Sequence, residues 1–208
     1  FRAVRPGHLT ERKASSMEKE ILRMEHISKS FGGAKALDDV SFDLRAGEVH
    51  ALMGANGAGK STLMKVLAGV YMPDSGKITH HGRVVPIKAC VADAQKDGVA
   101  MVFQELNILP HLSVLENIFI ANEITKNGIY DWKAMRKRAK EVMGEVGIDL
   151  NLDTRAGNLP VATQQMIEIT RALNLNSDII IFDEPTSSLS MTETESLFEL
   201  IGRLKKKG

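Results

Sequence analysis

Two segments near the start of the chain alternate apolar and polar residues with the period of a β-strand. They are Ile21 to Ser28 and Val40 to Leu44, and each is followed by a glycine-containing turn, at Phe31-Gly32-Gly33 and at Ala46-Gly47. Such alternation is typical of strands that bury one face. We therefore predict an antiparallel β layer in this part of the chain.

A second hairpin is predicted where turn residues separate short apolar runs. A tight turn at Pro73-Asp74-Ser75-Gly76 comes first, and Ile78 and Val84-Val85 then flank His80-His81-Gly82. Neighbouring residues of a strand point to opposite faces, so we do not expect the two histidines to share a metal ion. We place both of them at a solvated hairpin tip.

Helical patterns followed by short, fully apolar strands fill much of the remaining chain. A short helix near Lys88 to Lys96 precedes the strand Val99 to Phe103, and another helix precedes the strand Ile179 to Phe182. That second helix carries apolar or small residues at helical spacing, namely Met166, Ile169, Thr170 and Leu173. Strands without alternation are typical of parallel sheets covered on both faces, so the predicted fold class is α/β.

Residues 106 to about 165 are predicted to form a helical insertion. Ser113-Val114-Leu115-Glu116 is a capping box, and Asp131 is placed to cap a longer helix that Gly147 ends. The predicted apolar face of this longer helix consists of Trp132, Met135, Ala139, Val142, Met143 and Val146. Its basic face consists of Lys133, Arg136, Lys137, Arg138 and Lys140. We interpret the basic face as solvated rather than bound to nucleic acid.

The composition fits one sizeable core, or one core with a smaller subdomain attached. The 208 residues are 43% hydrophobic, and 27 Lys and Arg nearly balance 26 Asp and Glu. This balance provides no basic field that would favour nucleic acid or a lipid surface as the main partner. Cys90 is the only cysteine, which excludes an internal disulfide and suits a reducing compartment. No apolar run approaches the roughly 18 residues needed to span a bilayer.

A phosphate-binding loop lies at Gly54 to Thr62, which fits the pattern of Gly, four variable residues and Gly-Lys-Ser/Thr. The apolar run Val49 to Met53 is predicted to be the strand before it, and Leu63 to Leu67 to belong to the helix after it. Glycines let the backbone approach a phosphate closely and point N–H groups at it. The predicted nucleotide contacts are Gly54, Ala55, Asn56, Gly57, Ala58, Gly59, Lys60, Ser61 and Thr62.

Chemical roles within this loop follow from its side chains. Lys60 should reach the β- and γ-phosphates, and the Ser61 hydroxyl should bind the Mg²⁺ that bridges them.

Asp183 and Glu184 directly follow the second apolar strand. There Asp183 can hold the magnesium shell, and Glu184 can orient and deprotonate water. Phe31 is predicted to stack on a purine base, with a ring packed into the β layer as the alternative.

The P-loop, Gln104, the stretch Leu159 to Gln165 and the stretch Asp183 to Leu189 together resemble the ATP-binding-cassette ATPases. The resemblance covers residues 21 to 208. It implies a P-loop NTPase (RecA-like) core with an antiparallel β subdomain and an α-helical subdomain. It also implies ATP and Mg²⁺ as cofactors. Three roles follow from the resemblance: adenine stacking by Phe31, magnesium and water sensing by Gln104, and general base catalysis by Glu184.

The wording of two stretches resembles a narrower group, the first ATPase half of tandem sugar importers of the ribose and galactose type. These stretches are Phe103 to Leu106 and Thr186 to Ser190. The implied partners are a second nucleotide-binding domain, in the same full-length chain or in a homodimer, and membrane permease subunits. A solute-binding protein would act indirectly, and no nucleic acid partner is implied. The implied location is peripheral, at the cytoplasmic face of the cell membrane.

Two positions depart from the family pattern. Where the family usually has Leu-Ser-Gly-Gly-Gln, residues 159 to 163 read Leu-Pro-Val-Ala-Thr, which lacks the hydroxyl and the glycines. We therefore expect this signature to serve a partner's ATP poorly. Ser190 stands where the family often has an aspartate that communicates across the dimer.

The ends of the chain also bear on its organisation. Residues 1 to 16 show no periodicity before Met17, so we interpret them as an artificial extension and residues 17 to 208 as the nucleotide-binding domain. All histidines lie at or before His111, whereas the family carries a switch histidine on a later strand. We therefore expect the natural chain to continue beyond Gly208, and this fragment to hydrolyse ATP slowly.

Two alternative functions stay open beside an ATP-hydrolysing importer subunit. The unusual signature and the missing histidine also fit a regulatory module that binds ATP without turnover. A soluble cassette ATPase of DNA repair or translation is disfavoured because no basic run is long enough for nucleic acid.

Overall fold

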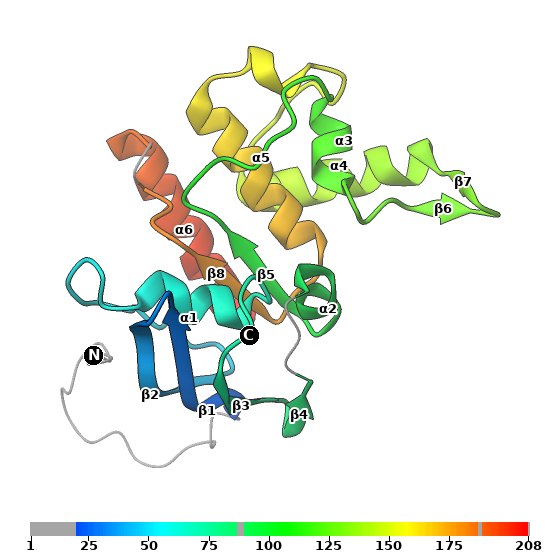
Figure 1. Ribbon diagram of the computed structural model, residues 1–208. Helices are drawn as coiled ribbons and strands as arrows, with labels where there is room; N and C mark the ends of the chain where they lie inside the picture. Colours follow the sequence, from blue (N-terminus) through cyan, green and yellow to red (C-terminus); the bar gives the residue numbers. More distant parts are fainter. Residues whose placement is uncertain (1–19, 87–89, 187–188, 208) are drawn as a thin grey trace, which may run out of the picture. The chain divides into compact units, whose positions relative to one another are not determined.

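A computed structural model describes residues 20–86, 90–186 and 189–207 (Figure 1). The predicted extension at residues 1 to 16, the start of the predicted helix at Lys88, and Ser187 and Ser188 lie outside the described residues. The chain divides into two compact units, one of residues 1–97 with 201–208 and one of residues 98–200. Each unit is described by itself below.

The first unit contains a four-stranded antiparallel sheet, as the alternation predicted. Its strands are β1 (Glu20–Phe31), β2 (Ala34–Arg45), β3 (Ser75–His80) and β4 (Arg83–Val85), in the order β2-β1-β3-β4. On β1, Leu22, Met24 and Ile27 are all buried although their spacing changes from two to three. A register shift between Met24 and Ile27 and a positive φ at His26 supply the bulge that returns Ile27 to the buried face.

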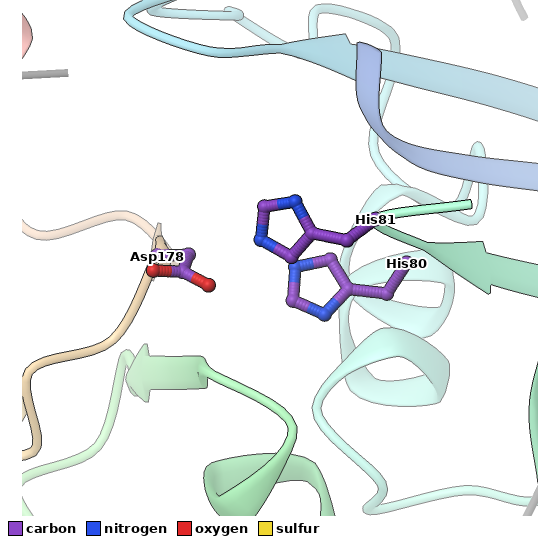
Figure 2. Close-up of side chains that lie close together, drawn as sticks. All are labelled: His80, His81 and Asp178. Atoms are coloured by element: carbon purple, nitrogen blue, oxygen red, sulfur yellow. The ribbon is translucent and has the colours of Figure 1, made fainter. Parts of the chain in front are cut away.

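The tip of the second hairpin differs from its prediction. His80 is buried, His81 is exposed, and their ring centroids lie 4.3 Å apart (Figure 2). The expectation that they point to opposite faces is wrong because β3 ends at His80 and His81 has a φ of 48°, outside extended geometry. The predicted solvated tip therefore applies to His81 and not to His80.

The run Val49 to Met53, predicted as the strand before the phosphate loop, forms no strand in the described part of the chain. Val49 and Met53 are 43% and 62% exposed. An extended segment becomes a strand only by pairing with a neighbour, and apolar composition does not supply that neighbour. This unit contains the helices α1 (Lys60–Leu67), which buries Leu63, Val66 and Leu67, and α2 (Val91–Lys96), together with the end of a later helix.

The second unit is organised around two parallel strands, β5 (Val99–Val102) and β8 (Ile179–Phe182). They pair in register from Val99 opposite Ile179 to Val102 opposite Phe182, which confirms the predicted parallel arrangement. Both strands therefore end at one edge. Helix α5 (Val161–Asn174) packs against β5, and α6 (Met191–Lys207) follows β8 and contributes residues to both units.

The remaining elements of this unit lie between β5 and α5 in sequence. They are α3 (Val114–Phe119), β6 (Thr125–Lys126), β7 (Ile129–Tyr130), α4 (Trp132–Val146) and the 3₁₀ helix η1 (Ala156–Asn158). Their common core consists of Val114, Leu115, Ile118, Phe119, Met135, Ala139, Met143, Leu152, Ala156 and Ile167. Because Ile167 belongs to α5, this core ties the helical segment to the helix that packs on β5.

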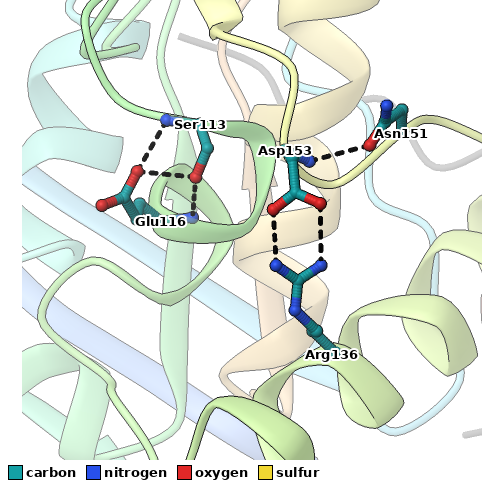
Figure 3. A network of polar contacts seen from close by, with 5 residues as sticks. All are labelled: Ser113, Glu116, Arg136, Asn151 and Asp153. Carbon is teal, nitrogen blue, oxygen red and sulfur yellow. Dashed lines mark hydrogen bonds and ion pairs between the residues drawn. The ribbon is translucent and has the colours of Figure 1, made fainter.

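The predicted helix ends are confirmed. Ser113 and Glu116 form the capping box of α3 (Figure 3). The Asp131 side chain accepts from the Ala134 N–H, and Gly147 ends α4 with φ +87°. Trp132 is the one wrong member of the predicted α4 apolar face, since it is 45% exposed. It lies in the first turn of α4, where its ring packs against Tyr130 of the short β6–β7 hairpin, with the two ring centroids 5.8 Å apart.

Arg136 belongs to the basic face of α4 and pairs with an acidic side chain of the same unit. It donates two hydrogen bonds to the carboxylate of Asp153, whose own N–H donates to Asn151 (Figure 3).

Among the described residues, no helix combines the length and apolar composition that a membrane span requires.

We expect Ser113→Ala to lower the free energy of unfolding by about 1 kcal/mol, because the Glu116 N–H loses its acceptor. Hydrogen bonds from Ser113 lower the pKa of Glu116. The stability that these hydrogen bonds to the Glu116 carboxylate contribute is therefore present above the ordinary pKa of glutamate. It is lost as the pH falls through the lowered pKa of Glu116. Urea unfolding at neutral and acid pH should show the variant's deficit shrinking in acid.

Ser196→Ala is the matched control for this prediction. Ser196 is exposed on α6, and its hydroxyl bonds back to the carbonyl of Thr192 in the same helix. We expect its removal to leave stability within about 0.5 kcal/mol of wild type. Equal losses for both serines would contradict the assigned role of the capping box.

Candidate functional site

The phosphate-binding loop leads directly into helix α1, as its sequence predicts. Gly59 is the N-cap with φ +83°, so no side chain caps the helix, and no acidic residue lies in its first turn. The positive end of the helix is therefore not neutralised by a carboxylate of its own first turn. An N-terminus of this kind favours a bound anion.

Gly59 and Gly57 have similar positive φ angles but different surroundings. A Cβ on Gly59 would lie 2.5 Å from the carbonyl oxygen of Ala36 and 2.9 Å from the side chain of Leu37, whereas a Cβ on Gly57 would meet nothing within 4 Å. Ala36 and Leu37 belong to β2. The end of the loop is therefore packed against the antiparallel sheet, while its middle is open.

Lys60 is held by the loop in which it lies. Its Nζ donates to the carbonyl oxygens of Gly54 at 2.8 Å and Ala55 at 2.9 Å. The loop thus wraps around an ammonium group at the start of α1. Ser61 and Thr62 follow in the first turn of this helix, where both are half-buried.

Phe31 lies at the end of β1 with 44% of its surface exposed. This exposure argues against the alternative of a ring packed within the β layer. Its ring and that of Tyr71 form a T-shaped pair with centroids 5.1 Å apart, and the Nζ of Lys29 lies 5.4 Å from the Phe31 centroid. Sequence reasoning missed Tyr71, whose only local signal is an aromatic residue shortly after the end of α1. Adenine stacking by Phe31 stays a prediction.

In the second unit, residues predicted separately come together at the carboxyl ends of β5 and β8. Asp183 is buried, and its N–H donates to the carbonyl of Val102, which extends the pairing of the two strands. Glu184 is exposed and has φ +49°. Gln104 Nε2 donates to Glu184 Oε2 at 3.1 Å. The predicted sensor and the predicted base are therefore direct neighbours.

The signature stretch leaves the N-terminus of α5 without a side-chain cap. The N-cap is Pro160, which makes no capping hydrogen bond, and Val161 begins the helix with half of its surface exposed. Pro160 provides neither a hydroxyl nor an N–H. This geometry agrees with the expectation that the stretch would bind a partner's phosphate poorly, which stays a prediction.

Ser190 closes a capping arrangement at the start of α6. Its hydroxyl donates to Glu193 Oε2 at 2.6 Å, its N–H donates to the same oxygen, and the Glu193 N–H donates back to its hydroxyl. The residue that replaces the family aspartate therefore bonds within its own helix end.

Comparisons with known proteins agree with this geometry. A family model described as ABC transporter matches residues 37–187. The chain belongs to this family. A ribose import ATP-binding protein of Caldanaerobacter subterraneus subsp. tengcongensis is 50% identical to this ABC transporter chain over 190 residues, which cover 90% of this chain and 38% of that protein. The chain thus spans well under half the length of this curated relative.

Solved structures share the fold of this ABC transporter cassette. The ADP conformation of an ATP-binding cassette of an ABC transporter is 32% identical, with a TM-score of 0.79, and the match covers 91% of this chain and 78% of that chain. A dimeric bacterial ABC transporter cassette is 25% identical, with a TM-score of 0.77, covering 90% and 84%. The predicted fold class, an α/β P-loop ATPase cassette, is confirmed.

The contrast between the two glycines gives a stability prediction. Gly59→Ala should destabilise the first unit far more than Gly57→Ala, because only at Gly59 does the added methyl group meet backbone atoms. Gly57→Ala should cost roughly 1–2 kcal/mol, the cost of a left-handed non-glycine residue. Thermal unfolding of the two variants without nucleotide measures the difference. Similar melting temperatures would show that the loop does not pack on β2 as described.

Proposed function

We propose that this chain binds Mg-ATP and hydrolyses it to power the import of a solute, a sugar in the favoured case. The observation that carries the proposal is the P-loop itself, in which Lys60 is enclosed at the start of α1 with no carboxylate in the first helical turn. The Lys60 ammonium group, the positive end of α1 and the N–H groups of the loop all favour the binding of a polyphosphate. Membership of the ABC transporter family supports ATP as that polyphosphate.

A magnesium ion fits the oxygen donors assigned to it. Mg²⁺ takes hard oxygen ligands, and Ser61, Asp183 and Gln104 supply a hydroxyl, a carboxylate and an amide oxygen. Because Gln104 Nε2 donates to Glu184, Gln104 Oε1 is the atom of this side chain that is left to face a cation. When bound, the ion would neutralise charge on the β- and γ-phosphates.

The protein's own residues then divide the work of hydrolysis. Lys60 offers its ammonium group to the β- and γ-phosphates in place of the two loop carbonyls that hold it here. Glu184 accepts a proton from the attacking water, and the Gln104 amide fixes the orientation of its carboxylate. Phe31 would bind the adenine ring by stacking.

Sugar import and the partners of this chain rest on its likeness to named proteins. The relative quoted above is a ribose import ATP-binding protein, and a cassette of similar fold forms a dimer. We infer a second nucleotide-binding domain, membrane permease subunits and, indirectly, a solute-binding protein as partners. We also place the chain peripherally at the cytoplasmic face of the membrane.

A second candidate is an ATP-binding module without turnover. The observation that favours it is the uncapped N-terminus of α5, where Pro160 and Val161 replace residues that would contact a partner's ATP. The two candidates agree on nucleotide binding and differ only on hydrolysis, so turnover by the wild-type protein separates them.

We expect Lys60→Ala to weaken Mg-ATP binding by about 10- to 100-fold, the loss expected when charge-assisted hydrogen bonds are removed. Glu184→Gln should bind Mg-ATP like wild type but lose turnover by about 100-fold or more. Calorimetry and phosphate release from the full-length protein measure the two effects. Unchanged affinity in Lys60→Ala would refute the P-loop assignment, and a wild-type protein that binds without turnover would establish the second candidate.

Phe31→Ala should weaken ATP binding by about 1–3 kcal/mol, the usual contribution of an aromatic ring that stacks on a base. Binding of inorganic triphosphate should not change, since it offers no base. Phe198→Ala is the control, because Phe198 is also exposed but lies on α6, away from β1 in sequence. Equal losses for ATP and triphosphate would mean that Phe31 only supports the fold.

A further inference from the structure

Helix α5 carries polar side chains that are buried although no role has been assigned to them. Gln165 is 3% exposed and Glu168 is 1% exposed, and Arg171 is mostly buried beside Glu168. Buried polar groups must be compensated by hydrogen bonds, so their partners show what these side chains do. The partners lie on the two loops that follow β8 and β5.

Gln165 binds the loop after β8. Its Nε2 donates to the carbonyl oxygen of Pro185 at 2.5 Å. Pro185 directly follows Glu184, whose φ of +49° is unfavourable for a residue with a side chain. The hydrogen bond therefore holds the backbone at the point where the chain turns and the Glu184 carboxylate is presented.

Arg171 binds the loop after β5. Its Nη1 donates to the carbonyl oxygen of Asn107 at 2.9 Å, and its Nη2 donates to Glu168 Oε1 at 3.2 Å. Burial raises the pKa of Glu168 and lowers the pKa of Arg171, while each partner's charge acts against this shift. The Arg171 guanidinium is thus fixed on one side by Glu168 and fixes, on the other, the chain three residues after Gln104.

We propose that Gln165 and Arg171 are positioning residues that hold Glu184 and Gln104 in mutual register. One rigid helix contacts both loops, and the side chains of those loops meet in the Gln104–Glu184 hydrogen bond. Gln165 acts through the backbone beside Glu184, and Arg171 acts through the backbone beyond Gln104. Neither side chain needs to touch the nucleotide. This inference rests on the ATPase activity proposed above.

Replacing Gln165 tests the first contact. Gln165→Ala removes the side chain, and Gln165→Glu keeps its shape but replaces the donating amide by a carboxylate. In the full-length protein, both should lower kcat for ATP about tenfold or more and leave KM within about twofold, because a misplaced base affects turnover rather than binding. Thr170→Val is the matched control, since Thr170 is buried on α5 and, among the described residues, bonds only to the Met166 carbonyl of its own helix.

A double-mutant cycle shows whether Gln165 acts through Glu184. In the Glu184→Gln background, Gln165→Ala should cause no further loss of the residual rate, because the group it positions is already gone. Full additivity of the two losses would overturn the proposal. So would a kcat for Gln165→Glu and Gln165→Ala that matches the Thr170→Val control.

Arg171→Lys tests the second contact while keeping a cation beside Glu168. Lysine lacks the planar fork that binds Glu168 and the Asn107 carbonyl together. We expect a kcat loss of about threefold or more that disappears in a Gln104→Ala background. A loss that persists there would refute the role assigned to Arg171. Absence of turnover in the wild-type protein would instead count against the proposed function, so the two failures are distinguishable.

Discussion

The parallel pairing of β5 and β8 is the constraint on which the second unit depends. Four residue pairs set the register, and the Asp183 N–H extends it by bonding to Val102. Gln104 and Glu184 can meet only because both strands end at the same edge. A slip of one residue would turn Asp183 to the other face of the pair and separate the two side chains that hydrogen-bond here.

The polar contacts of helix α5 depend on the same register, because they reach the loops that follow both strands. A buried ion pair such as Glu168–Arg171 contributes little net stability compared with apolar residues of the same size, since both groups lose their hydration. Its presence in the buried part of this helix is better explained by geometry, in which Arg171 reaches a backbone carbonyl that an apolar side chain could not hold.

Local signals in the sequence predicted the structure well wherever neighbouring residues decide it. Strand alternation predicted β1 and β2, and the caps at Ser113, Asp131 and Gly147 begin or end their helices as expected. The loop around Lys60 was recognised because its residues are consecutive. By contrast, the contacts of Gln165 and Arg171 join residues 20 and 64 positions apart, and no local pattern identifies such partners.

The wrong predictions have the same cause, since each depended on a neighbour that sequence does not specify. His81 was assigned the alternation of a strand that ends one residue earlier, and Val49 to Met53 was assigned a strand without a partner. Trp132 fits the apolar period of α4 but lies in its first turn, where its ring packs against Tyr130 rather than in the core.

The β1–β2 hairpin links the two ends of the proposed nucleotide site within one small piece of sheet. Phe31 pairs with Ala34 at the turn, and Ala36 on the same strand abuts Gly59 of the phosphate loop. The separation between the Phe31 ring, which we propose to stack on the base, and the phosphate loop is thus set by strand register. Inserting one residue in β2 between Ala34 and Ala36 would therefore change this spacing without replacing any residue of the ring or the loop.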